Sequence, residues 1–296
     1  MSNELGEFLR TRRARISPEE KGLPRGERRR VPGLRRDELA RLAGVSVEYY
    51  TRLEQGRSPN VSDSVLDAIA GALSLNDIES EHLRTLVRPT RRARPSPRGA
   101  KKLREPILAI LDQVDRIPAF VLGPRLDVLA WNRLADVLYR FSEDDLHLNM
   151  PRRIFLDPQA DELHPEWECA AADTVAVLRY VAARDPEDAK LAALVGELSM
   201  RSQRFRELWA RHDVKEKSFG PKVVSHPLVG RMDFAFESFP LAGEKDLMLV
   251  MYVPRPGSES ADKLALLASW SETFPEPEDE VAPGGGVAGP ADRVEH

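Results

Sequence analysis

The sequence predicts a multidomain protein, in which an all-α domain of five short helices precedes an α+β domain with an antiparallel sheet. Three observations support this fold class. The length of 296 residues exceeds the usual size of one compact domain. Apolar residues recur with helical spacing across residues 5–87. Beyond residue 103, runs rich in β-branched and aromatic residues stand before and after a block of helical stretches, which is typical of an α+β fold.

Five helices are expected in the N-terminal part. The first begins near Leu5 and ends before Pro18. Ser62 is in the position of an N-cap, and Asn76 with Glu79 three residues later has the spacing of a capping box. The four later helices are expected over residues 35–43, 47–55, 63–73 and 77–87.

Two basic stretches rich in Pro and Gly lie outside these helices. Residues 17–33 are expected to form a basic loop, and residues 89–102 a basic, Pro-rich linker. We therefore divide the chain into an N-terminal domain over residues 1–88 and a C-terminal domain over residues 103–273. The acidic tail over residues 274–296 is rich in Pro and Gly and is expected to be disordered.

The C-terminal domain is expected to place strands on both sides of a helical middle. A Gly123-Pro124-Arg125 turn separates the first two strands, and Ser258 caps the final helix. The last three strands are expected to be antiparallel. Expected strands cover residues 119–122, 127–131, 222–226, 229–238 and 247–253, and expected helices cover residues 103–114, 132–139, 167–183, 189–198, 203–212 and 258–269.

The composition excludes several classes of protein. An apolar fraction of 42% with 31% charged residues excludes a chain that is disordered throughout. No run approaches the ~20 apolar residues of a membrane span, and the chain does not open with a signal-peptide pattern. The single Cys169 excludes an internal disulfide, and six scattered His give no metal-binding spacing. We therefore expect a cytoplasmic protein that does not bind a membrane, a metal ion or a cofactor.

Charge is unevenly distributed along the chain. Residues 1–104 carry 23 Lys and Arg against 14 Asp and Glu, a net charge of +9, so the remainder carries −13 within a total of −4. A basic half favours a polyanion as partner, because phosphate backbones attract Lys and Arg irrespective of sequence. A solvated basic surface explains the same charge equally well.

Residues 36–53 have the pattern of two helices joined by a tight turn. Gly44 is the residue type that a turn with positive φ requires, and Ala40 supplies a small side chain where the helices touch. Ser46 is placed to cap the second helix. Together these three residues predict a steep crossing of the two helices.

The second of these helices is expected to bury one face and expose the other. A rotation of about 100° per residue places Tyr50, Leu53 and Glu54 on the inner side. Glu48 and Arg52 fall opposite, and in the major groove Arg suits guanine while Glu suits cytosine. An ordinary helical hairpin with a solvated face is the alternative.

Residues 5–87 resemble the lambda-repressor-like, XRE-type helix-turn-helix domain, and residues 53–57, Leu-Glu-Gln-Gly-Arg, are similar to its Leu-Glu-x-Gly-Lys/Arg signature. The resemblance implies binding to double-stranded DNA and an ion pair between Arg13 and Glu54. The residues that it assigns to DNA are Arg36, Arg57 and Asn60 for phosphates, and Val47, Glu48, Tyr49 and Arg52 for base edges.

The Arg-rich insert over residues 17–33 departs from the general family and narrows the resemblance to the regulators termed MmyB-like. That resemblance implies a C-terminal domain with a PAS-like fold, which binds an apolar small molecule such as a fatty acid. The stretches that carry it are 32–40, 44–57, 131–132, 149–158 and 207–213. The insert residues that either contact phosphates or stay solvated are Arg28, Arg29 and Arg30.

A ligand site is expected where the three C-terminal stretches combine an aromatic with a polar residue. Arg suits a carboxylate headgroup, and His is a neutral donor beside it. The candidates are Trp131, Asn132, Arg152, Phe155, Trp209 and His212, and further aromatics that suit a pocket wall are Trp167, Phe234 and Phe236. The alternative is that the aromatics are core, while Arg152 and His212 make structural contacts.

Motifs for catalysis are absent from the sequence, which has no nucleophile elbow and no phosphate-binding glycine loop after a strand. Cys169 is expected to be a packed thiol. We therefore do not expect an enzyme. We expect a homodimeric DNA-binding transcriptional regulator whose second domain senses an apolar effector. The alternative is a DNA-binding protein whose C-terminal domain serves only dimerisation or the docking of a protein partner.

Overall fold

A computed structural model describes most of the two expected domains. The described residues are 2–24, 33–57, 61–88, 103–216, 218–244 and 246–273. The expected linker over residues 89–102 and the expected tail over residues 274–296 lie outside them, as does much of the basic loop.

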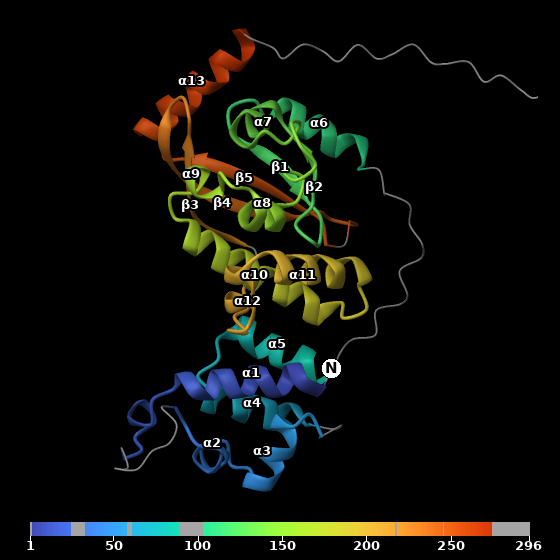
Figure 1. Cartoon of the computed structure of the whole chain (residues 1–296), viewed down its shortest axis with the longest axis vertical. Coiled ribbons are helices and arrows are strands. Elements are labelled where there is room, and N and C mark those ends of the chain that lie inside the picture. Colours follow the sequence, from blue (N-terminus) through green and yellow to red (C-terminus); the bar gives the residue numbers. More distant parts are fainter. Residues whose placement is uncertain are drawn as a thin grey trace, which may run out of the picture.

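Five α-helices make up the described N-terminal domain, as the sequence predicts (Figure 1). A short 3-10 helix, η1, lies within the stretch expected to be a loop. The helices are α1 (Ser2–Arg15), α2 (Arg36–Leu42), α3 (Val47–Glu54), α4 (Asp63–Ala72) and α5 (Asp77–Val87), and η1 covers Glu19–Lys21. The fully buried residues at their centre include Phe8, Leu9, Leu34, Leu39, Tyr50, Leu53 and Ile69.

The helix boundaries follow from local capping. The Ser46 hydroxyl accepts a hydrogen bond from the Tyr49 N–H at 3.1 Å. Asn76 and Glu79 exchange the two bonds of a capping box, at 2.9 and 3.0 Å. Gly44 has φ of +65° in the turn before α3. The expected caps and the expected positive φ are therefore confirmed.

A close approach between α1 and α3 depends on Gly6. A Cβ atom at this position would lie 2.1 Å from the backbone oxygen of Glu54, which is a steric clash. Since only glycine avoids it, the two helices pack backbone against backbone at this point.

The C-terminal domain contains one five-stranded antiparallel sheet with the order β2-β1-β5-β4-β3. The chain leaves the sheet after β2 for a long helical segment and returns at the opposite edge with β3. The last strand, β5, then closes the sheet beside β1. The strands are β1 (Ala119–Leu122), β2 (Val128–Trp131), β3 (Phe219–His226), β4 (Gly230–Pro240) and β5 (Met248–Pro254).

Helices cover both faces of the central strands. On one face, Ala119 and Val121 pack against Ile107 and Leu111 of α6. On the other, the side chains of β1 and β5 join the large core beneath the helical segment. The helices are α6 (Glu105–Gln113), α7 (Arg133–Tyr139), α8 (Met150–Leu156), α9 (Ala160–Leu163), α10 (Trp167–Arg184), α11 (Ala189–Arg201), α12 (Gln203–Trp209) and α13 (Glu259–Thr273).

Helix α8 was not expected as a separate element, and it forms despite Pro151. The Asn149 side chain accepts a hydrogen bond from the Arg152 N–H at 3.1 Å and so caps the helix. Pro151 lies in the first turn, where a missing N–H costs no intrahelical bond. The helix therefore begins at a cap that tolerates the proline.

The two domains are stacked end to end (Figure 1). Helices α10, α11 and α12 lie between the sheet and the N-terminal domain, where α1 and α5 face them. Helices α2 and α3 lie at the far end of the molecule. The helix-turn-helix unit therefore faces away from the C-terminal domain.

Asn132, one of the expected ligand residues, instead joins three segments of the fold. Its side chain is 5% exposed. Its oxygen accepts hydrogen bonds from the N–H groups of Ala119 and Ala135, at 3.0 and 2.9 Å. Its amide donates to the carbonyls of Val114 and Ile117. All its polar atoms thus bind backbone, because the end of α6, β1 and the start of α7 converge there.

We expect Asn132→Ala to lower the free energy of unfolding by about 3 kcal/mol or more, because several buried backbone groups lose their partners. Denaturation by urea, followed by circular dichroism, measures this change. Ser142→Ala is the control, since it removes one exposed side-chain bond to Asp136 and should cost less than about 1 kcal/mol. Equal stability of the two variants would contradict the structural role of Asn132.

Candidate DNA interface and ligand cavity

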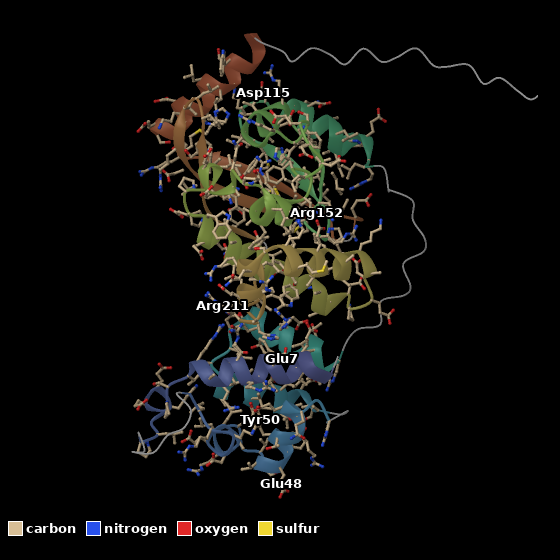
Figure 2. All side chains as sticks on the ribbon, in the orientation of Figure 1. Glu7, Glu48, Tyr50, Asp115, Arg152 and Arg211 are labelled. Carbon is tan, nitrogen blue, oxygen red and sulfur yellow. The ribbon has the colours of Figure 1, made fainter. Side chains whose placement is uncertain are left out.

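Helix α3 presents the outward face that the sequence predicts. Tyr50 and Leu53 are fully buried, whereas Glu48 and Arg52 are exposed. Figure 2 shows Glu48 at the outer end of the molecule and Tyr50 in the interior of the domain. Val47, at the start of the helix, is 44% exposed although it is apolar. This surface combines a cation, an anion and an apolar side chain within two helical turns.

The remaining expected DNA residues are only partly described. Tyr49 is half-buried on the flank of α3, and Arg57 is exposed just beyond its end. The Arg57 N–H donates to the Arg52 carbonyl at 2.8 Å, so the chain turns sharply there. Other expected DNA residues, Arg28, Arg29, Arg30 and Asn60, lie outside the described residues.

Glu54 is the buried anion that holds α3 against α1. Arg13 donates to both oxygens of the Glu54 carboxylate, at 3.3 and 3.2 Å, which confirms the expected pair. Arg36 of α2 donates from two nitrogens to the same carboxylate, at 3.2 and 2.9 Å. Burial opposes ionisation of Glu54, but the hydrogen bonds from Arg36 and Arg13 hold its pKa below the ordinary value.

The Arg36 side chain is therefore held in place by Glu54 and is also accessible to solvent. Its guanidinium is anchored on Glu54, while its side chain remains 49% exposed. An anchored but accessible guanidinium is pre-oriented for a phosphate, because little rotamer freedom is left to lose. The resemblance assigned this residue to phosphate contact, and the geometry is compatible with that assignment.

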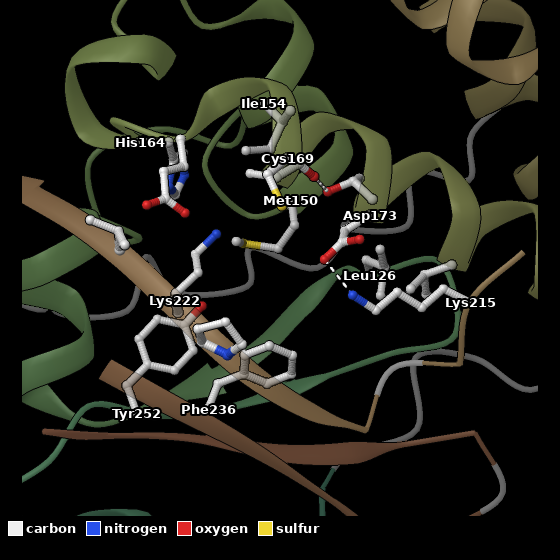
Figure 3. A pocket seen from close by; sticks show the side chains of 16 residues that line it. Leu126, Met150, Ile154, His164, Cys169, Asp173, Lys215, Lys222, Phe236 and Tyr252 are labelled. Carbon is white, nitrogen blue, oxygen red and sulfur yellow. Dashed lines mark hydrogen bonds and ion pairs between the residues drawn. The ribbon is translucent and has the colours of Figure 1, made fainter. Parts of the chain in front are cut away.

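A cavity of about 100 Å³ lies between the sheet and helices α8 and α10 (Figure 3). Apolar side chains form much of its wall, and charged groups stand at several points of its lining. The apolar residues include Leu126, Met150, Ile154, Val177, Phe236 and Tyr252, and the polar residues are His164, Glu166, Cys169, Asp173, Thr174, Lys215 and Lys222.

The Lys222 amine points into this cavity (Figure 3). Within the described part of the chain, it makes no hydrogen bond or ion pair. Burial lowers the pKa of Lys222 to about 8, and the carboxylate of Asp173 opposes that shift most strongly among its neighbours. Lys222 is thus a desolvated cation in the cavity without a direct partner.

Two further polar groups in the lining have unused hydrogen-bonding capacity. His164 is 1% exposed, and neither ring nitrogen makes a hydrogen bond of normal geometry, although the ring approaches the Val223 backbone. Burial holds the pKa of His164 well below its ordinary value, so the ring is neutral. The Tyr252 hydroxyl accepts a bond from Tyr139 at 3.0 Å and keeps its own hydrogen for another acceptor.

The expected ligand residues do not line this cavity. Trp131 packs against Phe141, with ring centroids 5.5 Å apart. Phe155 is in edge-to-face contact with Phe205 at 5.2 Å. Both rings are partly buried and pack against the large core of the domain. Of the further aromatics suggested for a pocket wall, Phe236 does line the cavity.

The expected headgroup residues are also occupied elsewhere. Arg152 donates from two nitrogens to Glu197 of α11, at 3.0 and 2.8 Å. Trp209 and His212 lie at the end of α12, where the C-terminal domain meets α1. Lys222 is one of the polar residues that line the cavity. The sequence did not indicate it, because the apolar residues of the expected strand over residues 222–226, Val223 and Val224, are adjacent and do not show which face is buried.

Cys169 is exposed and lies at the cavity, so the expectation of a packed thiol is wrong. Among the described residues, no three His, Cys, Asp or Glu side chains gather in a way that would hold a metal ion. The described helices include none that is both long enough and apolar enough to cross a membrane.

Comparison with protein families gives two matches. Residues 4–83 match a helix-turn-helix domain, and residues 103–267 match the MmyB-like transcription regulator ligand binding domain. The two matches cover the two domains of the fold. A search of curated proteins finds no match.

We expect Glu54→Ala to lower the free energy of unfolding by about 3 kcal/mol, because Arg13 is left buried without its carboxylate. Thermal and urea denaturation measure this loss. The exposed Glu48→Ala variant is the control and should keep wild-type stability. A wild-type midpoint for Glu54→Ala would contradict the role of this anion in joining α3 to α1.

Proposed function

The chain belongs to the MmyB-like transcription regulators, with a helix-turn-helix domain and a ligand-binding domain, and from this we propose that it is a sequence-specific regulator whose effector is an apolar acid. A fatty acid is the simplest example of such an effector. The observation that carries the proposal is the unpartnered Lys222 amine among apolar walls.

The chemistry of the cavity supports an amphipathic anion. An ammonium group with no direct partner favours a carboxylate, because a charge-assisted hydrogen bond offsets the cost of its burial. Tyr252 can donate a second hydrogen bond to the same headgroup. The wall formed by Met150, Ile154 and Phe236 suits a hydrocarbon tail. In this proposal Lys222 takes the headgroup role that the sequence analysis gave to Arg152.

For the DNA-binding domain, we propose that Val47, Glu48 and Arg52 read base edges, while Arg57 contacts phosphate. These side chains are exposed, and α3, which carries or directly precedes them, lies at the far end of the molecule (Figure 1), which supports this assignment. Helix-turn-helix domains commonly bind half-sites about one helical turn apart as dimers. We therefore propose a homodimer on DNA, which sedimentation of the protein with and without a two-half-site duplex tests.

We expect Arg52→Ala to weaken binding to the preferred duplex by about 1 to 3 kcal/mol, with little change on random duplex, because one bidentate base contact is lost. The preferred duplex is obtained by selection from random sequences, and affinities are measured at fixed salt. Arg84→Ala is the control, since Arg84 lies on α5 and pairs with Asp67. Equal losses on both duplexes would reassign Arg52 to backbone contact.

We expect lipid-stripped protein to gain thermal stability with saturated fatty acids, and Lys222→Met to lose about tenfold or more in affinity for them. Lys222→Arg is the matched control, because it keeps the charge. Affinity should fall as pH rises through about 8, since Lys222 then loses its proton, and Lys222→Arg should lack this fall.

Two outcomes would change this proposal. Equal affinity of the wild type and Lys222→Met would remove Lys222 from the headgroup site. No stabilisation by any acid of the series would favour the alternative function, in which the C-terminal domain serves only dimerisation or partner docking.

A further inference from the structure

Part of the contact between the domains is made by a short segment that directly precedes Lys215, a residue of the cavity lining. We define residues 209–214, which begin at the last residue of α12 and lead toward β3, as the docking segment. Asp213 in this segment accepts from Arg12 and Arg15 of α1, at 3.1 and 2.5 Å. Arg12 also donates to the His212 carbonyl at 3.0 Å, and the His212 ring lies 3.2 Å from the Glu7 carboxylate.

This contact between the domains includes buried polar side chains and partly buried apolar side chains. Arg12 is 5% exposed, and it binds Glu79 of α5 at 2.9 Å as well as Asp213. Val214 packs against the apolar core of the N-terminal domain. A buried arginine shared between two domains is costly to unpair, so the docked arrangement is a defined state.

Helix α10 supports the same interface from the C-terminal domain. Arg179 is 3% exposed, and its guanidinium lies 4.1 Å from the centre of the Trp209 ring. It also reaches Glu4 of α1 at 3.5 Å. Arg179 thus orders the start of the docking segment and contacts the N-terminal domain directly.

The docking segment is joined to the cavity through Lys215, the next residue in the chain. The Lys215 N–H donates to the Ala176 carbonyl at 3.2 Å, and its amine pairs with Asp173 at 2.6 Å. Lys215 and Asp173 both line the cavity. Asp173 and Arg179 are six residues apart on α10, or about 9 Å along the helix. The cavity and the interface therefore share one helix and one loop.

We infer that an acid bound in the cavity exchanges the Asp173–Lys215 ion pair and thereby releases the docking segment from α1, which frees the DNA-binding domain from the C-terminal domain. The inference rests on the proposed effector site and adds its regulation. A carboxylate bound beside Lys222 replaces Asp173 as the anion nearest to the Lys222 amine. The same carboxylate attracts the Lys215 amine away from Asp173.

The ion pair is suited to such an exchange. Its two side chains are 41% and 44% exposed, and pairs of this kind contribute little stability by themselves. Replacing one carboxylate by another therefore changes the position of Lys215 at small cost. The docked and released states form a two-state element on which ligand and DNA can both act, so each must change the affinity of the other by the same factor.

Hydrogen exchange on the full-length protein tests this coupling, with decanoate as the probe. We expect decanoate to raise exchange severalfold in residues 2–15 and 209–214 of the wild type. Lys215→Met should show raised exchange in both regions without decanoate, and decanoate should add little. The control is Lys190→Met, which changes an exposed lysine of α11 and should behave as wild type.

The outcomes separate this inference from the proposed function. If decanoate binds by calorimetry but leaves exchange in both regions unchanged, the coupling is refuted while the effector site stands. If no acid binds, the proposed effector site fails. Hydrogen exchange in Lys215→Met without ligand then still tests whether Lys215 holds the docking segment against α1. Wild-type exchange in a folded Lys215→Met variant would then refute the role of Lys215, and raised exchange in both regions would support it.

Discussion

Both domains of this protein depend on buried contacts between arginine and carboxylate that a single helix, α1, makes on two sides. Arg13 binds Glu54 and so fixes α3 within the N-terminal domain. Arg12, the next residue, binds Asp213 and so fixes the C-terminal domain. Because successive helical residues are about 100° apart, one helix can serve two interfaces. A buried guanidinium without its partner is strongly destabilising, so each contact stabilises the arrangement of the elements that it joins.

The cavity follows from the way the sheet is covered. Helix α6 packs on one face of the central strands, and the helical segment between β2 and β3 covers the other. On that second face, both ring nitrogens of His164 are buried without a hydrogen-bond partner, and the amine of the partly buried Lys222 lines the cavity without a direct partner. Buried polar groups are usually hydrogen-bonded, and their exceptions call for an explanation. In our proposal an anionic effector supplies the missing partner, and the loop at Lys215 connects that effector to the domain contact.

The sequence by itself determined the features that depend on local geometry. Ser46, Asn76 and Gly44 set helix starts and a turn, because caps and positive φ act within a few residues. Helical periodicity gave the buried and exposed faces of α3, and the family resemblance gave the pair between Arg13 and Glu54. The strand over residues 119–122 was predicted with the boundaries that the structure shows.

Only the tertiary structure decided which surfaces meet. The position of β5 beside β1, and the side chains that share the cavity, depend on contacts between residues far apart in the chain. Asn132 and His212 have the residue types of a ligand site, yet Asn132 binds backbone at the convergence of three segments and His212 lies where α1 docks. Polar side chains take the partner that folding brings to them, and spacing along the sequence does not specify that partner.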